Sequence, residues 1–190
     1  MENTIIHPSR RTFLGGMGKG ALSLAALGLL AGGKAFAQGN PAHDVQILNI
    51  ALGLEHEAIG AYQLGAQSGL LQKPVLNVAV LFQSHHKGHR DALAANIRTL
   101  GGTPIQEKPL EEYAKALNVG TLKNQTDVLE LAARLELGAT NAYLGVIPAF
   151  KDGQLAKVAA RLAADETMHW TALTGALAKA LPASPLYFGA

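Results

Sequence analysis

Hydrophobic positions along the chain recur at steps of three or four residues in four separate segments, which is the pattern of amphipathic helices. We predict helices at about 41–71, 74–100, 124–150 and 152–181. Only a few residues separate the first helix from the second and the third from the fourth, so each pair should form an antiparallel hairpin. The sequence therefore predicts an all-α fold.

Local signals for helix ends agree with these boundaries. Pro74 stands where a helix can begin, Asn124 or Thr126 can cap the third helix, and Gly101-Gly102 can end the second. About 23 residues then separate the hairpins, a length that a crossover down the whole bundle requires. We expect a short helix within it, at about 109–117. The predicted architecture is a four-helix bundle made of two hairpins joined by a long crossover.

Polar residues interrupt the apolar stripes in the same order in both halves. Each half has a glutamate, a tyrosine seven residues later, and then two metal-competent side chains spaced i, i+3. They are Glu55, Tyr62, His86 and His89 in the first half, and Glu136, Tyr143, Glu166 and His169 in the second. Residues spaced i, i+3 share a helix face, so the glutamates and the paired residues should converge in the core.

Burying a carboxylate or an imidazole without a partner costs several kcal/mol. A metal ion satisfies several such groups at once, and six of them repeated in register favour a metal site formed by Glu55, His86, His89, Glu136, Glu166 and His169. A metal-free network of Glu–His and Glu–Tyr hydrogen bonds is the alternative. Tyr62 and Tyr143 are either partners that orient a ligand or core residues whose hydroxyl finds one acceptor.

With these motifs, residues 38–190 resemble the ferritin-like superfamily, in particular its small exported members. That family places one Glu on the first and third helices and Glu-x-x-His on the second and fourth, and His86 is the one position here that departs from it. In di-iron members a carboxylate at that position commonly bridges the metals. The resemblance therefore implies one or two transition-metal ions, with a single ion or an asymmetric pair expected here. Iron is the expected metal, with Mn or Zn as alternatives.

Residues adjacent to the ligand positions point about 100° away on a helix. We therefore expect His56, Glu57, His85 and Asp165 to flank the site or to face solvent. Trp170 is interpreted as a packing residue.

Residues 1–37 have the features of a twin-arginine signal peptide. Ser9-Arg10-Arg11-Thr12-Phe13-Leu14 resembles the export motif, an apolar stretch follows it, and Ala35-Phe36-Ala37 matches a cleavage site. The apolar stretch is shorter than the ~20 residues that span a bilayer, so we expect cleavage rather than a stable membrane anchor. The expected partner is the twin-arginine export machinery, and the expected location is the periplasm.

Removing the leader changes the charge of the chain. The leader holds four of the 16 basic and one of the 14 acidic residues, so residues 38–190 carry 12 basic and 13 acidic ones. This near balance gives no indication of a nucleic-acid partner, and a homo-oligomer is compatible with it.

The sequence predicts a domain at 38–190 that binds metal and that handles Fe(II), O2 or peroxide as an oxidoreductase. The alternative is a non-enzymatic binding or stress-protection bundle with a structural metal or a metal-free polar core. Turnover is left open.

Overall fold

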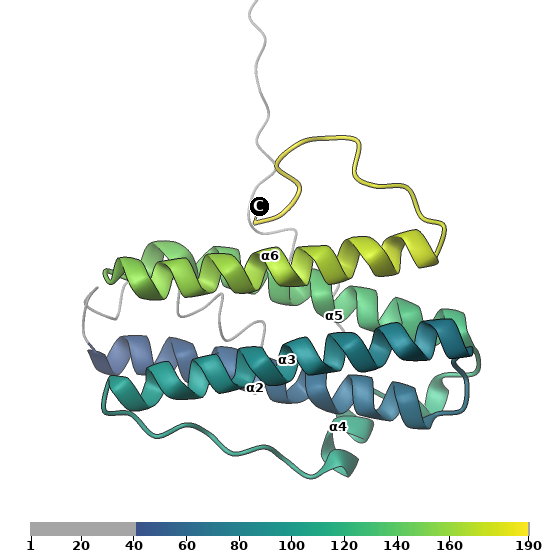
Figure 1. The fold of residues 1–190 in the computed structure, drawn as a ribbon, viewed down its shortest axis with the longest axis horizontal. Helices are drawn as coiled ribbons and strands as arrows, with labels where there is room; N and C mark the ends of the chain where they lie inside the picture. Colours follow the sequence, from purple (N-terminus) through teal and green to yellow (C-terminus); the bar gives the residue numbers. More distant parts are fainter. Residues whose placement is uncertain (1–40, 190) are drawn as a thin grey trace, which may run out of the picture.

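The computed structural model describes residues 41–189, and the regular structure in that range is entirely helical (Figure 1). The expected leader, with its arginine pair and cleavage site, lies outside the described residues. The four long helices are α2 (Pro41–Gln67), α3 (Lys73–Thr99), α5 (Gln125–Val146) and α6 (Gly153–Ala176). α2 pairs with α3 and α5 pairs with α6, so the predicted bundle of two hairpins is confirmed.

The first hairpin has the expected signals at its turn and at its end. α2 stops at Gln67, four residues before the predicted end, and Gly69 then takes a left-handed conformation at φ 71°. Pro74 occupies the first turn of α3, where its missing N–H costs no helical hydrogen bond. α3 ends at Thr99, and Gly101 just beyond it is left-handed (φ 77°), so that the amide of Gly102 donates to the carbonyl of Ile97 at 2.9 Å.

The second hairpin begins at a side-chain cap. Oδ1 of Asn124 accepts from the amide of Asp127 at 3.0 Å, which settles the choice between Asn124 and Thr126. α5 ends at Val146, earlier than the predicted Phe150, and a 3-10 turn follows at Ile147–Ala149. Pro148 lies in that turn and has no N–H with which to continue the α-helical pattern.

The crossover runs along the length of the first hairpin and brings the start of α5 to the end of the bundle where α2 ends (Figure 1). Asn49 on α2 anchors it, donating to the carbonyl of Thr103 at 3.1 Å and accepting from the amide of Ile105 at 2.8 Å. The short helix α4 (Leu110–Ala116) lies near the predicted position. A Cβ on Gly60 would lie 2.8 Å from the ring of Tyr113, so glycine lets α4 approach α2 closely.

Three apolar clusters form the core of the described residues: a small one beneath α4, which includes Tyr113 and Leu131, and two larger ones separated by a polar layer. One of the larger clusters includes Ile47, Leu93 and Val146, and the other includes Phe82 and Leu173. Along each long helix, the residues of one cluster precede the predicted ligand positions and those of the other cluster follow them. The polar residues therefore lie at one level in the middle of the bundle.

The end of α6 differs from the prediction. The helix stops at Ala176 instead of continuing to 181, and Ala178 takes a left-handed conformation at φ 53°. The remaining chain folds back over the bundle (Figure 1), where the ring centroid of Phe188 lies 5.2 Å from that of Trp170. Trp170 is thus a packing residue, as predicted. Within residues 41–189, no helix combines the length and the apolarity that crossing a membrane requires.

Candidate metal centre

The structure brings the six predicted ligand residues together in the polar layer. Each is buried, and none is more than 7% exposed. Their donor atoms form two overlapping groups in which one atom per residue lies within 4.8 Å of the others. The groups are Glu55, His86, His89 and Glu166, and His86, Glu136, Glu166 and His169. The four long helices therefore each supply ligand-competent atoms to one small volume.

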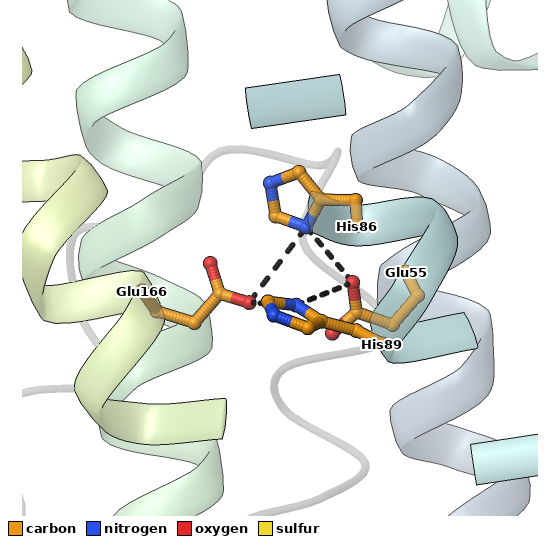
Figure 2. Close-up of side chains that lie close together, drawn as sticks. All are labelled: Glu55, His86, His89 and Glu166. Carbon is orange, nitrogen blue, oxygen red and sulfur yellow. Dashed lines mark hydrogen bonds and ion pairs between the residues drawn. The ribbon is translucent and has the colours of Figure 1, made fainter. Parts of the chain in front are cut away.

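In the first group, the histidines and glutamates already contact one another (Figure 2). Nδ1 of His86 lies 2.8 Å from Oε2 of Glu55, and Nδ1 of His89 lies 3.1 Å from Oε1 of Glu166. Nδ1 of His89 is also 3.5 Å from Oε2 of Glu55. These nitrogens and oxygens could hold an ion, but they also satisfy one another.

In the second group, three buried atoms have no hydrogen-bond partner among the described residues. They are Oε2 of Glu136, Oε2 of Glu166 and Nδ1 of His169. The histidine nitrogen lies 3.4 Å from the first oxygen and 3.5 Å from the second, so the three atoms gather at one point. Two carboxylate oxygens and an imidazole nitrogen form a donor set that suits iron, manganese or zinc. The residues present therefore fit a transition-metal ion on this side of the layer.

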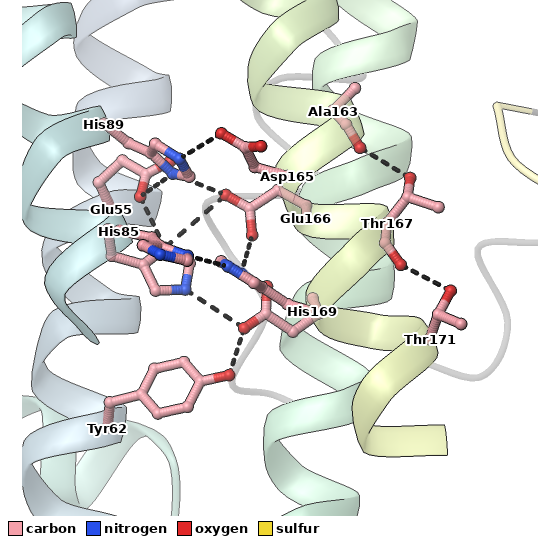
Figure 3. A network of polar contacts seen from close by, with 12 residues as sticks. Glu55, Tyr62, His85, His89, Ala163, Asp165, Glu166, Thr167, His169 and Thr171 are labelled. Atoms are coloured by element: carbon pink, nitrogen blue, oxygen red, sulfur yellow. Dashed lines mark hydrogen bonds and ion pairs between the residues drawn. The ribbon is translucent and has the colours of Figure 1, made fainter. Parts of the chain in front are cut away.

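Two of the histidines are oriented as metal ligands usually are. His89 and His169 both direct Nδ1 inward, and their Nε2 atoms have outer partners (Figure 3). Nε2 of His89 lies 3.2 Å from Oδ2 of Asp165, and Nε2 of His169 lies 2.9 Å from Nδ1 of His85. Such outer contacts fix the ring orientation and the tautomer of a ligating histidine. His85 and Asp165 were expected to flank the site, and they supply this support.

His86 is arranged differently, because both of its ring nitrogens point into the polar layer. Nδ1 faces Glu55 at 2.8 Å, and Nε2 lies 3.2 Å from Oε1 of Glu136. The ring thus joins the glutamates of α2 and α5 across the centre of the bundle. Both nitrogens of His86 therefore contact glutamates of the layer. Neither is left for a partner outside the layer, such as the Asp165 that contacts His89.

The two tyrosines form hydrogen bonds between the hairpins. The hydroxyl of Tyr62 donates to Glu136, and the hydroxyl of Tyr143 donates to Glu55. Seven residues of helix span about 10 Å, so each tyrosine is far from the glutamate of its own helix. The hydroxyl of each tyrosine instead reaches the glutamate of the other helix, which runs antiparallel to its own. Both hydroxyls therefore touch predicted ligands, a pairing that the spacing within one half did not predict.

Burial and charge shift the pKa values of these groups in opposite directions. Burial and the nearby Glu55 raise the pKa of Glu166 to about 7. Burial opposes ionisation of Glu55 too, but hydrogen bonds and charge from His86 and His89 outweigh it and lower the pKa of Glu55 to about 2. Burial disfavours the charged form of His89, yet Glu166 and Glu55 raise its pKa to about 10. An ion entering the layer must therefore displace protons near neutral pH.

His56 and Glu57 do not belong to this layer. His56 was expected to flank the site or face solvent, but it is only 5% exposed and lies under the crossover, near Glu107. The crossover covers a face of α2 that periodicity alone left to solvent. Glu57 is half-buried.

The fold and this layer identify the class of protein. Residues 43–179 match the family model of the ferritin-like domain, so the chain belongs to the ferritin-like family. The crystal structure of a conserved hypothetical protein from Mycobacterium tuberculosis is similar over 74% of this chain and all of that chain, with 21% identity and a TM-score of 0.61. At that identity the likeness concerns the fold alone. No curated protein sequence matches the chain.

Proposed function

We propose that this protein binds one or two transition-metal ions in the bundle core, with iron foremost, and serves oxidoreductase chemistry on Fe(II), O2 or peroxide. The observation that carries the proposal is the cluster of three buried donor atoms on Glu136, Glu166 and His169 without hydrogen-bond partners. Their mutual contacts, at 3.4 and 3.5 Å, are within ion-pair range but long for hydrogen bonds, so the protein interior leaves them poorly satisfied and one ion would satisfy all three. When bound, the ion would supply Lewis acidity and, if it is iron or manganese, electrons.

The chain's own residues have separable tasks around such an ion. Glu136, Glu166 and His169 would hold it, and His85 orients the imidazole of His169 through the 2.9 Å contact. Glu55 and His89, with Glu166, offer a second position. That position lacks the bridging carboxylate of the di-iron pattern, because His86 stands in its place. We therefore expect occupancy near one ion for each chain, with the second position weaker.

Metal analysis of protein purified from its native compartment tests this function. We expect about one iron, manganese or zinc ion for each chain, and we expect His169→Ala to lose it. The control is His56→Ala, since His56 is also buried but lies under the crossover and supplies no atom to either ligand group. Folded protein that contains no metal would refute the proposal. Equal metal in wild type and His169→Ala would refute this ligand set.

A non-enzymatic bundle with a metal-free polar core is the second candidate. The observation that favours it is His86, whose two nitrogens join Glu55 and Glu136 directly. In that case chelators would leave the melting temperature unchanged, and added Fe(II) would be neither retained nor oxidised. A melting temperature that falls on chelation would exclude this candidate.

We also propose that the protein is exported to the periplasm by the twin-arginine route and that its leader is removed after Ala37. The support is in the sequence, in Arg10-Arg11 and in the Ala35-Phe36-Ala37 site. Replacing both arginines by lysine should leave a longer precursor in the cytoplasm. Unchanged export of that variant would rule out the route.

A further inference from the structure

A cavity of about 260 Å³ lies beside the polar layer, in the half of the bundle that contains Phe82 and Leu173. All four long helices line it, together with Val119 and Leu122 of the crossover. Its walls are almost entirely apolar. The exceptions are Glu57 and the inner end, where Tyr62, His86 and Glu136 line it.

Small side chains keep this volume open. Ala58, Ala61, Gly65, Ala79 and Ala132 all line it, at positions where larger residues would fill the space. Protein interiors are otherwise close-packed, with few voids larger than a water molecule, and cavity volume lowers stability. An apolar cavity excludes water and accepts apolar ligands. A volume of this size next to a candidate metal site therefore indicates a binding site.

We place the mouth of the cavity between α3 and α6, where residues that line it are exposed. His85 of α3 stands opposite His169 of α6, and the two helices are antiparallel. Val78, seven residues before His85, therefore stands opposite Ala176, seven residues after His169. Both residues line the cavity, and both are exposed. Val78 shares a helix face with Phe82 and His86, but it is 40% exposed because it forms part of this rim. The mouth also explains the exposure of Ala176, the last residue of α6.

We propose that this cavity binds an unbranched hydrocarbon chain of about ten carbons, with its inner end beside His86 and Glu136. The size follows from volume, because a cavity of about 150 Å³ holds the six carbons of benzene. The shape follows from the lining, which extends along α3 from Pro74 to His86, roughly 18 Å of helix. A cavity that is long for its volume suits a linear chain better than a fused ring system. The inference rests on the proposed function only in placing the inner end of the chain beside a metal site. Binding of the hydrocarbon chain does not depend on it.

Binding is tested first on the metal-free protein with neutral probes, because Glu57 would repel an anionic headgroup. Isothermal titration with 1-alkanols from hexanol to tetradecanol should show affinity rising about fourfold for each added carbon, as expected for a buried methylene. The rise should stop near ten carbons, where the cavity is full. Absence of binding would overturn the inference. So would an affinity that keeps rising through tetradecanol, because that is the behaviour of surface adsorption.

The location is tested with a matched pair of variants on α5. Ala132 and Ala142 are both half-buried, but only Ala132 lines the cavity. Ala132→Phe should weaken decanol binding at least tenfold, and Ala142→Phe should leave it unchanged, with helicity checked by circular dichroism. Ala79→Leu on α3 repeats the test if Ala132→Phe loses helicity. Equal decanol affinity in a folded cavity variant and in wild type would overturn the assignment.

The contact with the metal site is tested on protein loaded with Co(II), whose visible spectrum reports its surroundings. Decanol should shift the cobalt bands in wild type but not in Ala132→Phe. Protein that retains no cobalt would overturn the proposed function. Protein that retains cobalt but binds no alkanol, or that binds decanol without a change in the spectrum, would overturn this inference and leave the metal site standing.

Discussion

His86 is the residue whose replacement separates the metal-binding and metal-free readings of the core most sharply. His86→Glu restores a fourth carboxylate and removes the group that lies 2.8 Å from Glu55 and 3.2 Å from Glu136. Removing one partner of a buried ion pair costs about 3–5 kcal/mol. The new carboxylate would also stand among three others. If the repulsion exceeded the cost of protonating the new glutamate at pH 7, the glutamate would take up a proton instead. That cost is roughly 4 kcal/mol, from a reference pKa of 4.3 and 1.36 kcal/mol per pH unit, and it is the upper limit of the repulsion.

With these two costs together, the metal-free variant should lose about 3–9 kcal/mol, a large part of the 5–15 kcal/mol that stabilises a typical domain. Metal should reverse this loss, because a fourth carboxylate offsets the charge of a second divalent ion. Urea unfolding followed by circular dichroism, in EDTA and with Fe(II) or Zn(II), measures both effects, and elemental analysis gives the stoichiometry. We expect occupancy to move from near one ion toward two.

His86→Gln is the control for this experiment. It removes the positive charge without adding a negative one, so the metal-free protein should lose stability while metal occupancy does not rise. Unchanged stoichiometry in His86→Glu, together with metal-free stability equal to wild type, would show that His86 neither closes the second position nor holds the glutamates together.

Two further predictions concern protons and the tyrosines. Glu166 and His89 have raised pKa values, about 7 and about 10, so the folded metal-free protein holds protons that the unfolded chain releases. Its urea midpoint should fall as pH rises from about 5 to 10, whereas apparent metal affinity should increase over the same range; a midpoint independent of pH would contradict this. Tyr143→Phe removes the donor to the buried Glu55 and should cost about 1–3 kcal/mol while metal is retained. Loss of metal in that variant would make the hydroxyl essential to the site.

Most of the architecture could be predicted because its signals are local. Asn124, Pro74 and Gly101 act on the few residues around them, and each sets a helix end in the structure as its chemistry suggests. Convergence of the ligand positions also followed from local rules, since i, i+3 spacing places His86 and His89 on one face of α3.

The parts that could not be predicted depend on how distant segments pack. The partner of Tyr62 is set by the register between two antiparallel helices, which no spacing within one helix encodes. His56 is buried because the crossover happens to cover it. Val78 follows the helical period of a core residue, but it stands at the mouth of a cavity. Periodicity identifies the face that a helix turns inward, and it does not reveal where that face leaves a gap.

The two tyrosine–glutamate hydrogen bonds join the hairpins to each other independently of the crossover that links them in the sequence. Tyr143 donates a hydrogen bond to Glu55, and Tyr62 donates one to Glu136. Each hairpin therefore provides a donor for the glutamate of the other hairpin, as the two subunits of a symmetric dimer do. A dimer of identical hairpins would carry the same residue at both positions that His86 and Glu166 occupy here. A single chain is free of that constraint. Joining the hairpins is what allows one half of the centre to hold an imidazole where the other holds a carboxylate.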